Sequence, residues 1–241
     1  MKLNSIPFFL SQTHRCDYLP EQSSQSLFID PDFAMTTRLY SMLIAYGFRR
    51  SGDLVYRPHC KACSACIPLR IPAARFRPDR SQRRTFRRNQ DISVNHSPAE
   101  FNEEHFQLFK RYLCARHADG SMVHSSKEDY VRFLCSSWCK TTFAEFRIGH
   151  QLAAVSVIDQ LNDAFSAVYT FFDTTISRQR SLGVFAVLWQ IQEAQKQGLS
   201  NVYLGYWIKA CGKMSYKDQY RPIEAYIDNR WRGYKKEEKI L

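Results

Sequence analysis

The first regular hydrophobic pattern in the chain has a helical period. Leu39, Leu43 and Tyr46 recur at intervals of three or four residues, as on the buried face of an amphipathic helix. Asp30 can cap the start of such a helix, and Gly47 can end it. We therefore predict a helix between these two residues.

Two capping boxes predict further helices. Ser97-Pro98-Ala99-Glu100 combines the box with proline at the first helical position. We predict that it opens a helix through about His117, with Phe101 facing the core. Ser126 and Asp129 repeat the device before a shorter helix. Both helices fall between two groups of predicted strands.

Short alternating stretches predict strands in the first hundred residues. They span 53–57, 67–74 and 92–96. Because 67–74 contains two prolines, which cannot donate to a ladder, we expect it to be an edge strand. The intervening stretch, 75–91, is compatible with a helix or with an ordered loop.

The second half has a different order of elements. Alternation and turn residues predict three strands, a long helix that Gly198 stops, a strand, a short helix and a last strand. Their ranges are 141–148, 152–159, 164–172, 177–197, 201–206, 209–217 and 222–227, and a charged tail at 235–241 is expected to fray. The fold class is therefore α+β. In the absence of a repeat or a linker, we expect a Cys/Arg-rich unit, 1–96, to pack closely against 97–241.

Composition narrows the class of protein. The chain has 241 residues, 44% of them hydrophobic, and a net charge of +11, which suits an ordered protein with an anionic partner. No apolar run approaches the roughly 18 residues that span a bilayer, and polar residues soon break the apolar run 6–10. We expect a cytoplasmic protein without a membrane partner. Its eight cysteines are then thiols or metal ligands rather than disulfides.

Much of the positive charge lies in one segment. Seven arginines occur in fourteen positions, with Phe76 and Phe86 between them. This composition suits a nucleic-acid surface, where cations meet phosphates and aromatic rings stack on bases. The alternative is a solvated basic face. The arginines are Arg75, Arg77, Arg80, Arg83, Arg84, Arg87 and Arg88.

The cysteine turn that precedes this segment suggests a metal site. Cys60, Cys63 and Cys66 stand at two-residue intervals, a spacing that can place three thiolates around zinc or an iron–sulfur cluster. Cys16, His59 or His14 is available as the fourth ligand. Reduced structural thiols are the alternative, and a zinc-stabilised RNA-binding module without catalysis is one reading of the whole chain.

The order of elements in the second half resembles the acyltransferase fold of the GNAT superfamily, a mostly antiparallel sheet flanked by helices. In that superfamily the loop that enters the long helix holds a pyrophosphate with backbone N–H groups. Arg178 to Gly183 takes this place here, so Arg178 and Arg180 are candidate phosphate contacts. A solvated helix start is the alternative. A CoA-dependent N-acetyltransferase would use the same loop.

Several motifs together are similar to the bacterial branch of the arginyl-tRNA–protein transferase family, over about residues 14–228. They are Leu27–Asp30, Tyr46–Gly52, Tyr56–Pro58, Cys60–Cys66, Ser81–Arg84, Arg87–Asn89, Arg180–Gly183, Tyr203–Ile208 and Lys213–Lys217. The resemblance implies transfer of leucine from leucyl-tRNA to the N-terminal Asp or Glu of a protein, which marks it for degradation as an N-degron. Arginyl-tRNA is the alternative donor. Leu19 and Ala65 stand where longer members of the family carry cysteine, so the metal site of those members does not transfer intact.

Acyl transfer from an aminoacyl-tRNA needs no strong nucleophile, because the ester is activated and an α-amine is partly neutral near pH 7. No cofactor is therefore required.

For the acidic side chain we select the arginines that flank the cysteine turn, with structural ion pairing as the alternative: Arg49, Arg50 and Arg70. The resemblance to acyltransferases implies that strand 164–172 and the strand Tyr203–Trp207 splay apart and that the amine and the ester meet there. For proton transfer at this point we select Tyr206, Lys213 and Tyr216, with ordinary core and surface roles as the alternative. For tRNA we select Arg75, Arg80, Arg83, Arg84, Arg87, Arg88, Arg178 and Arg180.

Overall fold

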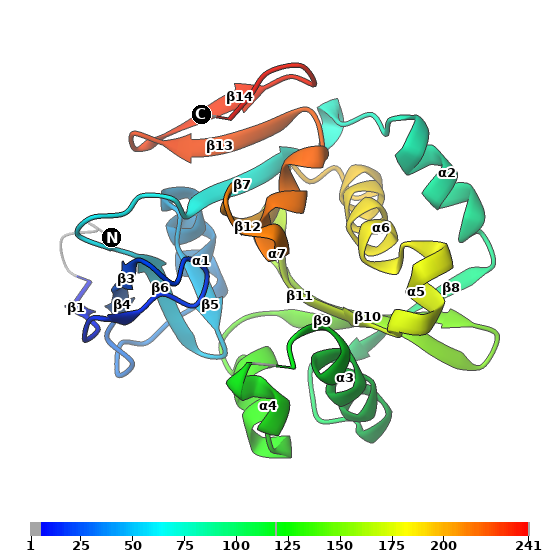
Figure 1. Cartoon of the computed structure of the whole chain (residues 1–241), viewed down its shortest axis with the longest axis horizontal. Coiled ribbons are helices and arrows are strands. Elements are labelled where there is room, and N and C mark those ends of the chain that lie inside the picture. The colour runs from blue at the N-terminus through cyan, green and yellow to red at the C-terminus, as the bar shows by residue number, and fades with distance from the viewer. Residues whose placement is uncertain (1–5, 119, 241) are drawn as a thin grey trace.

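The fold is known from a computed structural model that describes residues 6–118 and 120–240. An eight-stranded sheet runs through the centre of the molecule (Figure 1). In sheet order, its strands are β14 (Arg230–Tyr234), β13 (Ile223–Ile227), β7 (Ile67–Pro72), β12 (Asn201–Trp207), β11 (Ala164–Phe172), β10 (Gln151–Gln160), β9 (Thr141–Ile148) and β8 (Ile92–Pro98). Every neighbouring pair is antiparallel except β11 and β12, which are parallel. The α+β class with a mostly antiparallel sheet is confirmed.

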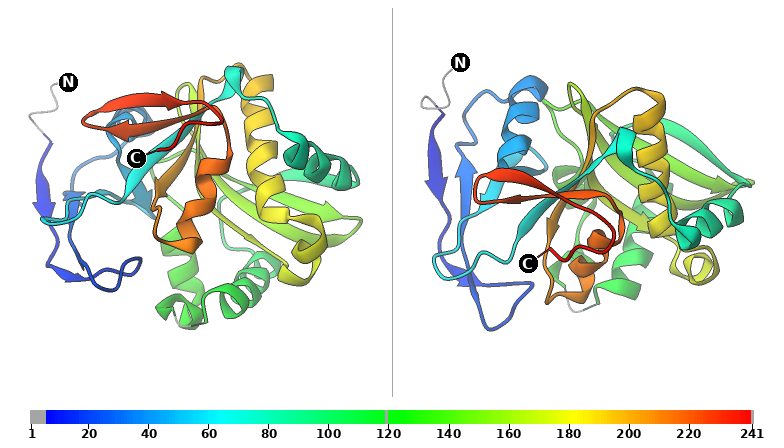
Figure 2. Two further views of the ribbon diagram at one scale, coloured as in Figure 1. Left: turned by 45° about the horizontal axis from the view of Figure 1, so that its top comes forward. Right: turned by 90° about the horizontal axis from the view of Figure 1, so that it is seen from above.

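Two smaller sheets precede the central one. The four-stranded sheet has the order β1 (Phe8–Leu10), β4 (Ser26–Ile29), β6 (Leu54–Pro58) and β5 (Arg49–Ser51), and the two-stranded sheet joins β2 (His14–Arg15) to β3 (Ser23–Ser24). They lie at one side of the molecule (Figure 2).

Helices cover both faces of the central sheet (Figure 1). The helices are α1 (Thr37–Leu43), α2 (Arg80–Arg88), α3 (Glu103–Arg116), α4 (Lys127–Leu134), α5 (Thr174–Arg180), α6 (Leu182–Lys196) and α7 (Gly212–Ser215), with 3-10 turns η2 (Ile44–Tyr46), η3 (Ala73–Arg75), η4 (Ser121–His124) and η5 (Tyr216–Gln219). Along β10, Ala154 and Ile158 join the core under α6, while Val155 and Val157 join the core under α3 and α4. Because successive side chains of a strand point to opposite faces, a strand covered on both sides is apolar throughout. None of the helices in the described ranges is long and apolar enough to cross a membrane.

The first helix begins later than its pattern predicts. Thr36, not Asp30, is the cap, and its hydroxyl accepts a hydrogen bond from the Leu39 amide at 3.2 Å. Asp30 instead accepts from the Asp32 amide in a local turn. The predicted end is correct, because Gly47 adopts φ 83° after η2. Asp30 and Pro31 therefore form a turn several residues before the helix, and they do not start it.

The first capping box is also wrong, whereas the second is confirmed. Ser97 and Pro98 belong to β8, and Asn102 caps α3. Phe101 lies outside the helix with 38% of its surface exposed. In contrast, Ser126 and the side chain of its box partner cap α4 as predicted. Strand pairing with β9 outweighed the local capping pattern at residue 97.

The proline-containing strand β7 is central, not an edge strand. It lies between β12 and β13. The contact with β13 is limited to the pairs Arg70–Glu224 and Leu69–Ala225. Only the residues between the two prolines pair with this neighbour, which explains how a proline-containing strand is accommodated.

Within the stretch 75–91, for which a helix or a loop was expected, residues 80–88 form the helix α2, whose start has a capping box between Asp79 and Gln82. Two other expectations change. The long helix is two helices, α5 and α6, separated by Ser181 at φ 54°. The tail does not fray throughout, because Ile240 is buried in the main core. Strand β14 was not predicted; it completes a hairpin with β13.

Candidate functional site

The parallel pair β11 and β12 separates after three residues. Ala164, Phe165 and Ser166 pair with Asn201, Val202 and Tyr203, and no pairing follows, although β11 continues to Phe172 and β12 to Trp207. A register shift between Tyr203 and Gly205 accompanies the change on the side of β7. Such irregularities bend a strand. The predicted divergence is therefore present, and it exposes strand backbone groups to other partners.

Arg49 of β5 occupies this divergence. Its guanidinium donates to the Ser166 hydroxyl at 3.1 Å and to the Ala167 carbonyl at 2.6 Å, both on β11. On the β12 side it passes Gly205, where a Cβ atom would lie 3.1 Å from Nε of Arg49. Gly205 also has φ +75°, so glycine suits both the backbone and the close approach. Arg49 thus bridges two strands that no longer pair.

Lys217 of η5 reaches the same point from the other direction. Its ammonium donates to the Tyr206 carbonyl at 2.6 Å and lies 3.7 Å from the sulfur of Met214. Only 9% of its surface is exposed. Burial, aided by the charge of Arg49, lowers the pKa of Lys217 to about 7, and Cys66 and Cys211 oppose this shift. Lys217 was not among the predicted site residues, because no local pattern marks a lysine as buried.

Arg50, the next residue of β5, has a different environment. It donates to both carboxylate oxygens of Asp159, at 2.8 and 2.6 Å, and both side chains are completely buried. Further bonds go to the carbonyls of Gly52 and Leu134. All of this binding capacity is used within the protein.

Arg70 is likewise engaged. It donates to Glu224 at 2.7 Å, and its guanidinium lies 4.3 Å from the centre of the Trp231 ring. Of the three arginines predicted to bind an acidic side chain, the structure therefore leaves Arg49 alone without a carboxylate partner within salt-bridge distance among residues 6–118 and 120–240.

The three predicted proton-transfer residues lie at different depths. The Tyr206 hydroxyl is buried and donates to the Gly47 carbonyl at 2.8 Å, and burial raises its pKa well above the ordinary value. Lys213 is exposed on α7. Tyr216 is 47% exposed, yet burial of its phenol and nearby Tyr112 raise its pKa to about 12. The Tyr206 hydroxyl therefore lies within the fold, whereas Lys213 lies on the surface.

The predicted phosphate contacts form an exposed surface centred on α2. Arg80, Arg84 and Arg87 are exposed. Four other arginines of this surface bind groups of the protein itself. Arg83 donates to the Pro78 carbonyl and Arg88 to the Gln179 carbonyl, while Arg75 pairs with Glu224 and Arg180 with Asp91. Arg178 is exposed on α5. The free cations of this surface thus come mainly from one helix.

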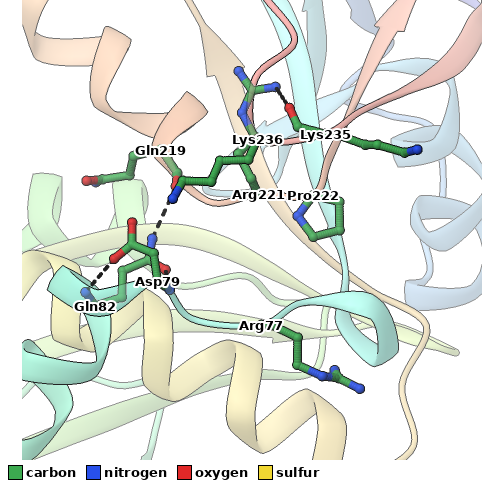
Figure 3. A pocket seen from close by; sticks show the side chains of 8 residues that line it. All are labelled: Arg77, Asp79, Gln82, Gln219, Arg221, Pro222, Lys235 and Lys236. Carbon is green, nitrogen blue, oxygen red and sulfur yellow. Dashed lines mark hydrogen bonds between the residues drawn. The ribbon is translucent and has the colours of Figure 1, made fainter.

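A cavity of about 320 Å³ adjoins the start of α2 (Figure 3). Its lining combines the segment before α2, the connection into β13 and the tail after β14. The lining residues are Arg77, Asp79, Gln82, Gln219, Arg221, Pro222, Lys235 and Lys236. Four of the eight are cations and one is an acid, so the cavity extends the basic surface of α2.

Four of the cysteines, Cys16, Cys60, Cys63 and Cys66, share one neighbourhood. Burial, followed by the proximity of Cys16, Cys60 and Cys63, raises the pKa of the Cys66 thiol to about 12. The Cys60 sulfur exchanges hydrogen bonds with the backbone of Gln25 at 3.5 Å. Within the described residues, no group of three or more His, Cys, Asp or Glu side chains is arranged to hold a metal ion.

Comparisons with known proteins identify the class. A family model described as "Arginine-tRNA-protein transferase, N terminus" matches residues 14–84, and one described as "Arginine-tRNA-protein transferase, C terminus" matches residues 104–227. The aspartate/glutamate leucyltransferase of Nitrosococcus oceani is 53% identical over 94% of this chain and 95% of the relative. That of Pseudomonas putida is 51% identical over 95% and 97%. These matches define an enzyme, an aminoacyltransferase.

The chain belongs to the arginine-tRNA-protein transferase family. The resemblance that the sequence motifs indicate is thereby confirmed. Among solved structures, L-PGS from Bacillus licheniformis aligns with a TM-score of 0.45 at 12% identity, over 69% of this chain and 49% of that one. The aligned part thus spans about half the length of that protein.

Proposed function

We propose that this enzyme transfers leucine from leucyl-tRNA to the α-amino group of a protein whose first residue is Asp or Glu, and so marks that protein for degradation through the N-degron route. The observation that carries the proposal is an identity of 49–53% over 94–95% of the chain to relatives named aspartate/glutamate leucyltransferase. A buried arginine without an acid supports the acidic acceptor. An exposed arginine-rich helix supports the tRNA donor.

The finer assignment of the fold belongs to this proposal. We assign a GNAT-like acyltransferase core to 97–241 and a Cys/Arg-rich unit to 1–96. The support is a parallel strand pair that diverges after three residues in a sheet with helices on both faces. Strands β7 and β8, from the first 98 residues, complete the same sheet, so the two units share it. The reacting groups would meet at the divergence.

The acceptor would bind through its acidic side chain. Arg49 is the best placed of the three arginines, because Arg50 and Arg70 already hold Asp159 and Glu224. A guanidinium can bind a carboxylate through two parallel hydrogen bonds. With the side chain fixed, the α-amine attacks the ester carbonyl of leucyl-tRNA. A C–N bond forms, the C–O bond to the ribose breaks, and the amine proton passes to the leaving oxygen.

Proton transfer would use groups at the rim of the divergence. Lys213 is exposed on α7 and would meet the leaving ribose oxygen. Tyr216, whose raised pKa keeps its phenol protonated, would donate a hydrogen bond to the same oxygen. Tyr206 would act by holding β12 against the N-terminal unit through its bond to Gly47. Most of the rate acceleration would come from placing amine and ester at attack distance, worth about 7–11 kcal/mol.

The tRNA would lie along the basic surface. Arg80, Arg84 and Arg87 offer exposed cations on α2, and the cavity beside this helix adds Arg77 and Lys236. The remaining arginines, Arg75, Arg83, Arg88, Arg178 and Arg180, would shape or border this surface. The reaction requires no cofactor, and leucyl-tRNA with an Asp- or Glu-initiated protein would be its partners in the cytoplasm.

The test uses purified protein, leucyl-tRNA and a peptide that begins with Asp. We expect labelled leucine to appear at the peptide N-terminus, and no transfer to the same peptide beginning with Asn. A parallel reaction with labelled arginyl-tRNA checks the donor. Transfer of arginine but not leucine would make the donor assignment wrong.

A further inference from the structure

Two buried cations meet at consecutive residues of β12. Arg49 approaches Gly205, where an added Cβ would lie 3.1 Å from its Nε atom, and Lys217 donates to the carbonyl of Tyr206 at 2.6 Å. Arg49 is 8% exposed and Lys217 is 9% exposed. They come from β5 and η5, more than 160 residues apart in the chain. Tertiary structure alone brings these two charges together.

Among residues 6–118 and 120–240, neither cation has an acidic partner within salt-bridge distance. In the described part of the chain, the buried side chains of Arg, Lys, His, Asp or Glu type are Arg49, Arg50, His105, Asp159 and Lys217. Arg50 is paired with Asp159, and His105 with Glu145. Arg49 and Lys217 bind only carbonyl and hydroxyl oxygens and a sulfur. Like charges buried together without a counter-ion oppose folding, and they persist where a ligand supplies the opposite charge.

We propose that Lys217 and Arg49 together form the receptor for the acidic side chain of the acceptor's first residue, with its carboxylate held between the ammonium and the guanidinium. This inference rests on the proposed function and adds Lys217 to it. Two of the three ammonium hydrogens bind the Tyr206 carbonyl and the sulfur of Met214, which leaves one for a carboxylate oxygen.

Binding of the acidic side chain would change the protonation of Lys217. In the free enzyme, burial and then Arg49 lower the pKa of Lys217 to about 7, with Cys66 and Cys211 opposing. A bound carboxylate adds a strong opposing charge, so the pKa rises and Lys217 takes up a proton as the acceptor binds. Affinity for the acid is therefore complete below pH 7 and falls as the pH rises above it. A Lys217 that instead accepted a proton from the α-ammonium group would favour high pH.

The first experiment measures peptide binding without tRNA. Calorimetric titrations between pH 6 and 9 compare a peptide that begins with Asp with the same peptide beginning with Asn. Both peptides carry the same α-amine, so the ratio of their affinities isolates the carboxylate. We expect the Asp preference to fall by up to about tenfold per pH unit above 7. Two buffers of different ionisation enthalpy should also show proton uptake with Asp alone.

Substitutions assign the effect to Lys217. In Lys217→Met, we expect Asp binding to weaken at least tenfold toward that of Asn, while Asn binding is unchanged. Lys217→Arg should retain the Asp preference and lose its pH dependence, because arginine stays charged. An Asp preference that grows with pH in the wild-type protein would overturn the proposal. So would an undiminished preference in Lys217→Met.

The controls separate this inference from the proposed function. If wild-type enzyme transfers leucine but Lys217→Met discriminates Asp from Asn as before, only the receptor is wrong. If wild-type enzyme transfers no leucine to any peptide, the proposed function is wrong. Retention of leucyl-tRNA on a filter checks that each variant is folded. Should Lys217→Met fail to fold, the wild-type pH series and Lys217→Arg still decide.

Discussion

Arg49 and Arg50 are neighbours on strand β5 but have opposite charge environments. Both are buried, and because strand side chains alternate, they point to opposite faces of β5. Arg50 meets Asp159 through two short hydrogen bonds. Within the described ranges, the hydrogen bonds of Arg49 go only to uncharged groups of β11. Its charge also lies close enough to Lys217 to lower the pKa of that lysine. The same residue type in the same strand is electrically balanced on one face and unbalanced on the other.

The difference separates structural from functional charge. In a buried pair such as Arg50–Asp159 the two charges neutralise each other, and removing one partner leaves the other charge buried without a counter-ion. In the described part of the chain Arg49 has no acidic partner, so its charge is available to an anionic ligand. Stability measurements should therefore report on Arg50, whereas acceptor recognition should report on Arg49.

The largest expected effect is on Arg50. Arg50→Met leaves Asp159 buried and unpaired, so we expect the free energy of unfolding to fall by about 3–5 kcal/mol, measured by urea denaturation. The double variant Arg50→Met with Asp159→Leu should recover most of this loss, because both charges are gone. An Arg50→Met protein as stable as wild type would contradict the structural role.

Arg49→Met should have the converse profile. We expect kcat/KM for an Asp-initiated peptide to fall about 100-fold, because a buried charge partner contributes about 2–5 kcal/mol to recognition. The free energy of unfolding should change less than in Arg50→Met. If the two variants lose equal stability and Arg49→Met stays active per folded molecule, the distinction between the two arginines fails.

Exposed arginines provide a third case, in which solvent screens the charge. Replacing Arg84 and Arg87 by Ala should weaken tRNA binding about tenfold near 0.1 M salt and reduce the slope of log K against log salt by nearly two. Filter binding across a salt series measures both. Arg132→Ala, on α4, is the matched control and should leave the slope unchanged.

The smallest expected effect concerns the stability cost of Lys217. In wild type, the folded state loses the proton of Lys217 above about pH 7, while the unfolded chain keeps it to about pH 10.4. Stability therefore rises with pH across this interval. Relative to wild type, Lys217→Met should therefore be more stable at pH 6 than at pH 9, because only the wild-type protein gains stability from this proton between the two pH values. Parallel denaturation curves at both pH values check this, and an advantage that grows with pH would refute it.

Local signals predicted much of the fold. Alternation in 141–172 located β9, β10 and β11 almost to the residue, and Gly198 ended α6 as expected. Errors arose where a local signal competed with a distant partner. The box at Ser97 was overruled by pairing with β9, and the prolines of β7 were accommodated by a limited pairing with β13.

The sequence by itself determined the family, the α+β class, the arginine-rich segment and the place where β11 and β12 diverge. These properties depend on motifs and on spacings of a few residues, which can be read from the sequence directly. It did not determine which arginine is free, because Asp159 lies 109 residues from Arg50 and Glu224 lies 154 residues from Arg70. Nor did it mark Lys217, whose burial depends on β5 and β12. Charge balance is a property of contacts, and the tertiary structure decided it.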